Sequence, residues 1–172
     1  MTNTAAQANT AKPSHKPSAA KVNPPAPKDA IAMLRAEHEE VVQLFAEYGK
    51  ARSATSKKAL IADICAALTV HAQIEEELFY PAIQSALKDK LLVPEATVEH
   101  GCVKALIAQL EGTEPGGEMV DAQVKVLSEY VKHHVKEEHT EMFPKAKASS
   151  IDMVALGALM AVRKGGLMAL AA

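Results

Sequence analysis

Two copies of a His-x-x-x-Glu pattern are the residues of this sequence best suited to chemistry. They are His71 with Glu75 and His134 with Glu138. Positions four residues apart on an α-helix lie on the same face about one turn apart, so each pair points in one direction. Imidazole nitrogens and carboxylate oxygens together form the mixed ligand set typical of iron, manganese and zinc sites. The two pairs therefore predict a metal site.

Two further histidines, His38 and His100, lie among apolar residues in the segments that precede these pairs. Four imidazoles and two carboxylates would then face one interior, where an unpaired charge is costly. A single inward histidine is more often a hydrogen-bonded core residue, but six such groups in symmetric spacing favour a metal. The set predicts two bound ions, with iron preferred over manganese or zinc and with the carboxylates able to bridge between the ions.

An internal repeat supports this interpretation. Three pairs of residues are separated by 63 positions and a fourth by 62: His71 and His134, Glu75 and Glu138, Pro81 and Pro144, and His38 and His100. Several coincidences at nearly one offset indicate a duplicated helical hairpin, and two hairpins packed together make an up-down bundle.

The spacing of apolar residues predicts the helices that must position these groups, because residues three or four apart share one helix face. The expected segments are about 29–52, 57–88, 94–110 and 118–148, followed by a short amphipathic helix. Pro81 should kink or shorten the second segment, since proline lacks the amide proton and clashes with the preceding turn. The fold class is therefore all-α, an antiparallel up-down four-helix bundle.

The chain divides into three parts. Residues 1–28 form a basic Pro/Ala/Lys-rich tail without acidic residues, which we expect to be disordered because it cannot bury enough apolar surface. Residues 29–148 form the bundle, and residues 149–172 form the C-terminal amphipathic helix.

The amino-acid composition limits the classes of protein to which this chain can belong. Hydrophobic residues make up 48% of the 172 residues, aromatics only 3%, and the formal net charge is −2. This charge favours neither nucleic acid nor a membrane surface as a partner, and the longest apolar run, within 153–162, is too short to span a bilayer. Two cysteines far apart in sequence give no disulfide framework, and no apolar leader is visible. A cytoplasmic location is the expectation.

The ligand pattern and its flanking residues resemble the hemerythrin-like, or HHE cation-binding, domain family. The resemblance is carried by Glu-His at 37–38 and 99–100, by Glu-Glu-Glu-Leu-Phe-Tyr-Pro at 75–81, and by Glu-Glu at 137–138 followed by Met-Phe-Pro at 142–144. It covers about residues 29–148. The resemblance implies a non-haem diiron centre in which Glu75 and Glu138 bridge the ions.

In the same way, the resemblance implies that His38, His71, His100 and His134 are terminal ligands. The sequence departs from oxygen-carrying hemerythrins at Lys104, where those proteins have a fifth histidine. One ion would then keep an open position, which puts simple oxygen carriage in doubt. The Lys104 ammonium lies either near that position or, as we prefer, at the surface.

Other polar residues near the pattern are given lesser roles. Glu137 could pair with His133 as an alternative ligand pair, but the position of the following proline favours His134 with Glu138. Glu137 is then adjacent to the site or supports it, like Lys104. His133 and His139 are expected to be solvated, and Tyr80 to be a packing residue.

Three functions are compatible with these features. The first is a metal-binding protein that binds or senses oxygen, nitric oxide or iron. The second is a diiron enzyme that acts on peroxide or oxygen, using the open position. The third is a metal-free helical interaction module. The expected partner is a small diatomic molecule or peroxide.

Overall fold

The computed structural model of the chain describes residues 1–2, 29–88, 90–111, 113 and 117–171. From residue 3 onward, the predicted tail lies outside the described residues, as does most of the loop expected at 111–117. The described part is helical: α1 (Ala30–Lys50), α2 (Ala54–Ile74), η1 (Glu75–Phe79), α3 (Tyr80–Ala86), α4 (Leu92–Glu111), α5 (Glu118–Glu137), η2 (Glu138–Met142), α6 (Phe143–Lys147) and α7 (Met153–Ala171). The elements η1 and η2 are single π-helical turns.

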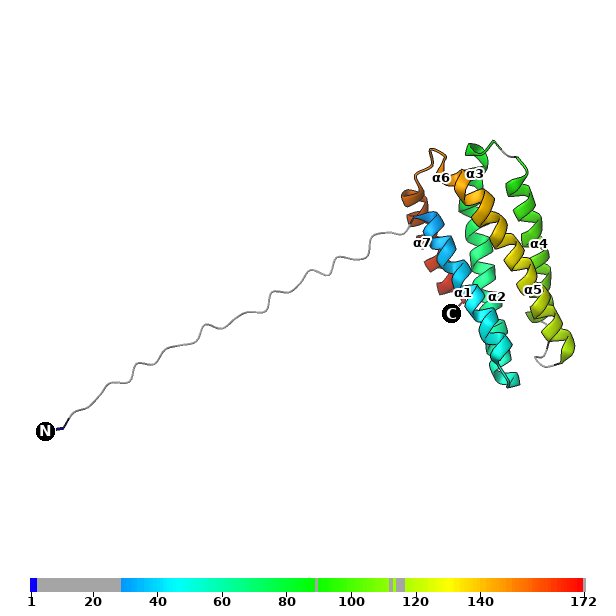
Figure 1. Ribbon diagram of the computed structural model, residues 1–172, viewed down its shortest axis with the longest axis horizontal. Coiled ribbons are helices and arrows are strands. Elements are labelled where there is room, and N and C mark those ends of the chain that lie inside the picture. Colours follow the sequence, from blue (N-terminus) through cyan, green and yellow to red (C-terminus); the bar gives the residue numbers. More distant parts are fainter. Residues whose placement is uncertain (3–28, 89, 112, 114–116, 172) are drawn as a thin grey trace.

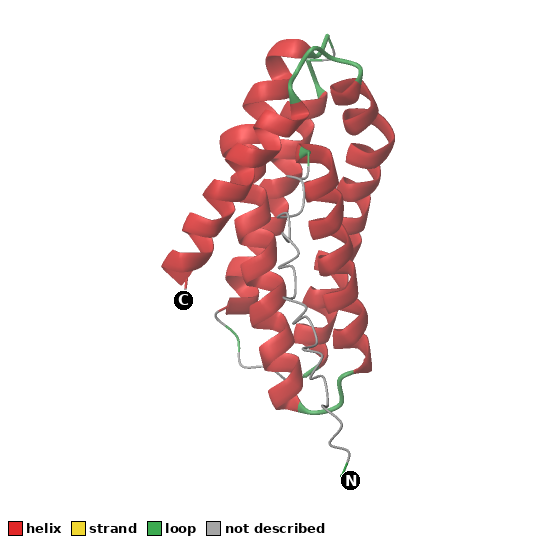
Figure 2. Cartoon of the chain, turned by 90° about the vertical axis from the view of Figure 1, so that its left-hand side faces the viewer, coloured by secondary structure: helices red, strands yellow, loops and turns green. Residues whose placement is uncertain are grey.

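The elements form four long antiparallel rods and a fifth helix beside them (Figures 1 and 2). One rod is α1, the second is α2 with η1 and α3, the third is α4, and the fourth is α5 with η2 and α6. The chain runs up and down through these rods in sequence order (Figure 1). The predicted all-α four-helix bundle is therefore confirmed.

Helix starts are set by local hydrogen bonds. The Asp29 carboxylate accepts from the amide of Ala32 at 2.8 Å, and the Ser53 hydroxyl accepts from the amide of Ser56 at 3.0 Å. These side chains satisfy amides of the first turns of α1 and α2 that have no partner within the helix.

Pro81 and Pro144 change the helices in a way that the sequence did not predict. Pro81 does not end its rod, which continues to Ala86; instead the preceding turn widens, and the Tyr80 amide donates to the carbonyl of Glu75, five residues back. The Phe143 amide donates to Glu138 in the same way. A widened turn gives the proline ring room where a regular turn would bring it against a carbonyl.

The extra residue in each widened turn shifts the register of the side chains that follow. Leu78 lies seven residues after His71 and would face inward with it in a regular helix, but it is only half buried. Phe79 and Tyr80 are buried in its place, at 0% and 2% exposure, and Phe143 is fully buried in the second copy. The two π turns therefore direct aromatic side chains into the core beside Glu75 and Glu138.

The apolar core consists of two clusters. One gathers around Ile31, Leu34, Phe79, Ile83 and Phe143. The other lies toward the opposite end of the rods and includes, among others, Ile64, Leu68, Val103, Val124 and Leu127. On each of the four rods the predicted ligands fall between the residues of the two clusters, so the polar groups form a layer inside an otherwise apolar core.

Helix α7 lies within the segment 149–172 expected for the C-terminal helix and continues through Gly165 and Gly166. It packs on α1 and α2, where Met160 is fully buried. The Arg163 guanidinium also donates to both carboxylate oxygens of Glu77, at 2.6 and 2.9 Å.

By length and composition, α7 is the one helix of the described residues that could cross a membrane. The stretch Met153–Leu170 meets the criterion, and 22% of it is buried against the bundle. One such helix does not by itself show that the chain meets a membrane, so the expected absence of a membrane partner stays a prediction.

Candidate metal centre

All six predicted ligands meet in the polar layer. His38 comes from α1, His71 from the last turn of α2, His100 from α4 and His134 from α5. Glu75 and Glu138 are the first residues of the two π turns. None of the six is more than 6% exposed. Their ligand atoms fall into two groups that share Glu75, and the atoms of each group lie within 4.8 Å of one another: His38, His71, Glu75 and Glu138, and Glu75, His100 and His134.

The imidazoles face one another in two pairs. Nε2 of His38 lies 3.0 Å from Nε2 of His71, and Nε2 of His100 lies 3.2 Å from Nε2 of His134. Glu75 Oε2 lies between the pairs, 3.2 Å from His71 Nε2 and 3.3 Å from His100 Nε2. A carboxylate in this place reaches both pairs of histidines.

The outer nitrogens of the histidines are also bound. Nδ1 of His71 donates to Glu37 at 2.8 Å, and Nδ1 of His134 donates to Glu99 at 2.7 Å. We did not assign Glu37 and Glu99 from the sequence. The available signal was the Glu-His dipeptide, which occurs at both His38 and His100; each glutamate binds the histidine of the neighbouring rod rather than its own neighbour.

These outer hydrogen bonds fix which ring nitrogen carries the proton. A carboxylate only accepts, so the proton of a neutral His71 or His134 lies on Nδ1, and its Nε2 lone pair points into the core. His100 is held in the same way, because its Nδ1 lies 3.0 Å from Glu76 Oε1. Two lone pairs 3.2 Å apart, as in His100 and His134, repel each other unless a proton or a metal cation lies between them.

The two carboxylates also have incomplete hydrogen bonding. Among the described residues, Glu75 Oε1 and Glu138 Oε2 are buried and accept no hydrogen bond. Glu138 Oε2 lies 3.3 Å from His38 Nε2, but outside hydrogen-bonding geometry. Buried acceptors of this kind are costly unless something binds them. A bound cation would satisfy both oxygens, so the residues present fit a metal site.

Burial lowers the pKa of two of the buried histidines, which favours the neutral form that binds a metal, but raises the pKa of Glu75, which favours a proton in place of a metal. Loss of hydration lowers the pKa of both His38 and His100 to about 4, so these rings are neutral at pH 7. Burial, together with the neighbouring Glu138 carboxylate, raises the pKa of Glu75 well above its ordinary value. Without a cation, Glu75 therefore tends to hold a proton.

Tyr80 is the main site residue that we misinterpreted from the sequence. Its hydroxyl lies 3.1 Å from Glu138 Oε1, 3.3 Å from Glu75 Oε2 and 3.2 Å from His100 Nε2. It is not simply a packing residue, because the π turn directs its hydroxyl into the polar layer. The corresponding residue of the other hairpin is Phe143, whose ring stacks on His38 with centroids 6.0 Å apart.

The structure also shows where the polar residues predicted to lie near the site make their contacts. Lys104 points to the surface, as preferred, and binds both oxygens of Glu76 at 2.6 Å. Glu76 thereby links Lys104 to His100. His139 was wrongly expected to be solvated: its Nε2 lies 2.9 Å from Nδ1 of His38, and its Nδ1 lies 3.0 Å from Arg35.

His133 is exposed, as expected, with 63% of its side chain accessible. Its Nε2 lies 3.2 Å from Glu137 Oε1, on the outside of the bundle. This pair therefore lies apart from the six buried groups, and Glu137 is adjacent to the site rather than part of it.

Known proteins resemble this chain in sequence and fold. The family model described as the hemerythrin HHE cation binding domain matches residues 29–146. A DNA nickase from Nostoc sp. is 27% identical over 111 residues, which cover 64% of this chain but only 31% of that protein, so the chain matches about a third of its length. A crystal structure of a hemerythrin HHE cation binding domain-containing protein from Mycobacterium kansasii aligns with a TM-score of 0.69 and 25% identity, covering 81% of this chain and 87% of that one.

The family match spans well over half of the chain, and its limits agree with the helices that supply the buried histidines and glutamates. The family and these buried groups together point to metal binding. This protein belongs to the hemerythrin HHE cation-binding domain family.

Proposed function

We propose that this chain binds two iron ions in its polar layer and uses them to bind or sense oxygen or nitric oxide. The observation that carries the proposal is the pairing of buried histidines. Two facing Nε2 pairs, 3.0 and 3.2 Å apart, have Glu75 between them. Ligand atoms at about 2.1 Å from a shared ion stand about 3.0–3.4 Å apart, so each pair has the spacing of two ligands on one ion.

A small cavity beside the histidines supports a diatomic ligand. It has a volume of about 20 Å³ and is lined by the four buried histidines and by six apolar residues: Val41, Leu68, Ala72, Val103, Val131 and Val135. A space of this size holds about one water-sized molecule. Its apolar wall favours an uncharged molecule over an anion. When bound, the iron pair would supply the affinity for oxygen or nitric oxide, while the chain sets the size of the ligand.

Metal content tests this proposal. Protein purified without added metal should contain about two irons per chain, with a visible charge-transfer band. Changing His71 or His134 to Ala should remove most of the metal. The matched control is Lys132→Ala, which alters an exposed side chain on the same helix as His134 and should retain the full content at equilibrium. Full retention of metal in both the His71 and His134 variants would refute the ligand assignment.

Tyr80 favours a second candidate function, the disproportionation of peroxide to water and oxygen. Its hydroxyl holds a proton next to both carboxylates, where a buried donor could protonate a small oxidant. We expect Tyr80→Phe to lower peroxide turnover about 100-fold while metal content is unchanged. Turnover no greater than that of free iron in the unaltered protein would remove this candidate and leave the binding function.

The name of the Nostoc relative does not extend to this chain, because the match covers 31% of that protein. The formal net charge of −2 also gives the chain no general attraction to nucleic acid. We therefore propose a function without nucleic acid.

A further inference from the structure

A second group of possible metal ligands lies on the surface, between α4 and α5. It consists of Glu99, His133 and Glu137, whose ligand atoms all lie within 4.8 Å of one another. His133 Nε2 is 3.4 Å from Glu99 Oε1 and 3.2 Å from Glu137 Oε1. These distances again match those between ligands of one ion in roughly tetrahedral geometry. We call these three residues the outer cluster.

The charges around the outer cluster favour a cation. Glu137 also experiences the negative charges of Glu95 and Glu141. An imidazole with several oxygen ligands is a typical set for a divalent first-row metal. The exposed fractions are 63% for His133, 32% for Glu137 and 17% for Glu99, so an ion could reach the cluster from solvent.

Glu99 joins the outer cluster to the buried site. Its Oε1 faces His133, while its Oε2 accepts from His134 Nδ1 at 2.7 Å. A cavity of about 10 Å³ has Glu95, Glu99 and Glu137 in its wall, together with the buried ligands His134 and Glu138. The rest of its wall is apolar and consists of Leu92, Ala96 and Met142. This volume is close to the smallest that holds one water. An ion entering it would shed most of its water and exchange one oxygen ligand for the next.

From these contacts, we propose that the outer cluster binds a divalent cation and passes it to the buried site. The binding step stands by itself, and the transfer step rests on the proposed function. Carboxylates line the route from the surface to Glu138, so the cation would have negatively charged oxygen ligands along it.

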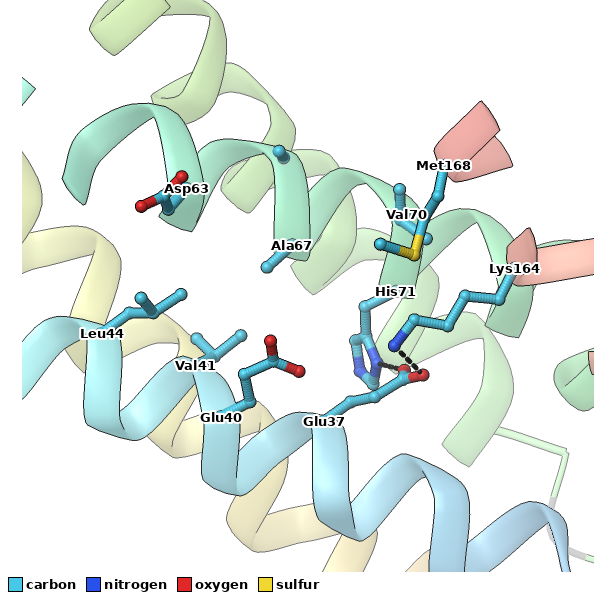
Figure 3. A pocket seen from close by; sticks show the side chains of 11 residues that line it. Glu37, Glu40, Val41, Leu44, Asp63, Ala67, Val70, His71, Lys164 and Met168 are labelled. Atoms are coloured by element: carbon cyan, nitrogen blue, oxygen red, sulfur yellow. Dashed lines mark hydrogen bonds and ion pairs between the residues drawn. The ribbon is translucent and has the colours of Figure 1, made fainter. Parts of the chain in front are cut away.

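A second opening reaches the site from the other side but is less suited to a cation. It is a groove of about 440 Å³ between α1, α2 and α7, and it borders His71 (Figure 3). There the Lys164 ammonium binds Glu37 at 2.9 Å, next to His71 (Figure 3). Glu40 and Asp63 also line this groove, so it is a competing route, but next to His71 the Lys164 ammonium offsets the charge of Glu37.

Two double variants of the full chain, one for each opening, test which opening the metal ion uses to reach the buried site. The test variant is His133→Ala with Glu137→Gln, and the matched control is Glu40→Gln with Asp63→Asn, which removes two carboxylates from the α7 groove. Metal-free protein is mixed with ferrous iron under anaerobic conditions. Iron that has become inaccessible to a colorimetric chelator is then measured against time.

We expect the test variant to load about tenfold more slowly than the unaltered chain, a typical effect of removing local charge, and to reach the same final content. The control should load at the unaltered rate. Equal rates for the test variant and the unaltered chain, or slow loading of the control alone, would overturn the proposal.

A zinc titration separates the outer cluster from the buried site. In a Glu75→Gln chain, which has a damaged buried site, adding His133→Ala should reduce bound zinc by about one ion per chain. Equal zinc binding by the two chains would overturn the outer site, even if the buried site takes up iron normally. If adding His133→Ala removes the expected zinc ion, the outer cluster is supported, even if the buried site takes up no iron.

Discussion

Iron-loaded protein should melt about 10 °C above the same protein stripped of metal. A ligand that binds only the folded state stabilises it by about 4 kcal/mol when its free concentration is about 1,000 times the dissociation constant. For a domain of this size, each kcal/mol raises the melting temperature by about 2–4 °C. The physical source is the buried layer, because a cation would satisfy Glu75 Oε1 and Glu138 Oε2, which accept no hydrogen bond from the described residues.

The measurement is thermal unfolding followed by circular dichroism, on chelator-treated protein before and after anaerobic addition of ferrous iron. The increase should disappear in His71→Ala and His134→Ala and persist in the exposed-residue control Lys132→Ala. An unaltered protein whose melting temperature does not respond to iron, manganese or zinc would instead favour the metal-free interaction module.

The second large effect concerns the metal-free protein, where Glu75→Gln should be more stable than the unaltered chain at neutral pH. The pKa of Glu75 is raised in the folded state by burial and by Glu138, above the ordinary value of 4.5. A raised pKa contributes stability that is fully present below pH 4.5 and is lost as the pH rises through the folded-state pKa. Glutamine resembles the protonated carboxyl and does not titrate, so the variant avoids this loss.

The stability difference between the variant and the unaltered chain should therefore grow with pH above 4.5, by up to about 1.4 kcal/mol per pH unit. Urea unfolding of metal-free protein at pH 5, 6 and 7 measures it, and Glu47→Gln, at an exposed position on α1, serves as the control. A difference that is constant or shrinks with rising pH would mean that Glu75 is not the proton-holding carboxylate.

Much of the fold was predictable because the ligands and the core share one helical spacing. The stripes around His100 and His134 consist of residues that are in fact buried, such as Val103, Ile107 and Val131. The sequence also repeated its ligands at nearly one offset, which fixed the pairing of the hairpins. Local spacing was sufficient wherever the helix stayed regular.

Prediction failed where the helix was irregular or where contacts joined different rods. The π turns moved Phe79 and Tyr80 inward, and no regular stripe includes both. Glu37 and Glu99 bind histidines of other rods, at sequence separations of 34 and 35 residues. His139 fails for the same reason, because its partner His38 is 101 residues away. Such contacts depend on how the rods rotate against each other, which spacing along one helix does not determine.

The two hairpins are joined in one chain, and this has a consequence for how the site can vary. A homodimer of a single hairpin would supply the same six ligands about a twofold axis, but each substitution would then occur twice. In this chain, equivalent positions of the two hairpins vary separately. A hydroxyl enters the polar layer at Tyr80 but not at Phe143. Likewise, the outer nitrogen of His100 faces Glu76, while that of the equivalent His38 faces His139. Covalent fusion thus gives the protein two unlike half-sites, an asymmetry that strict subunit symmetry would forbid.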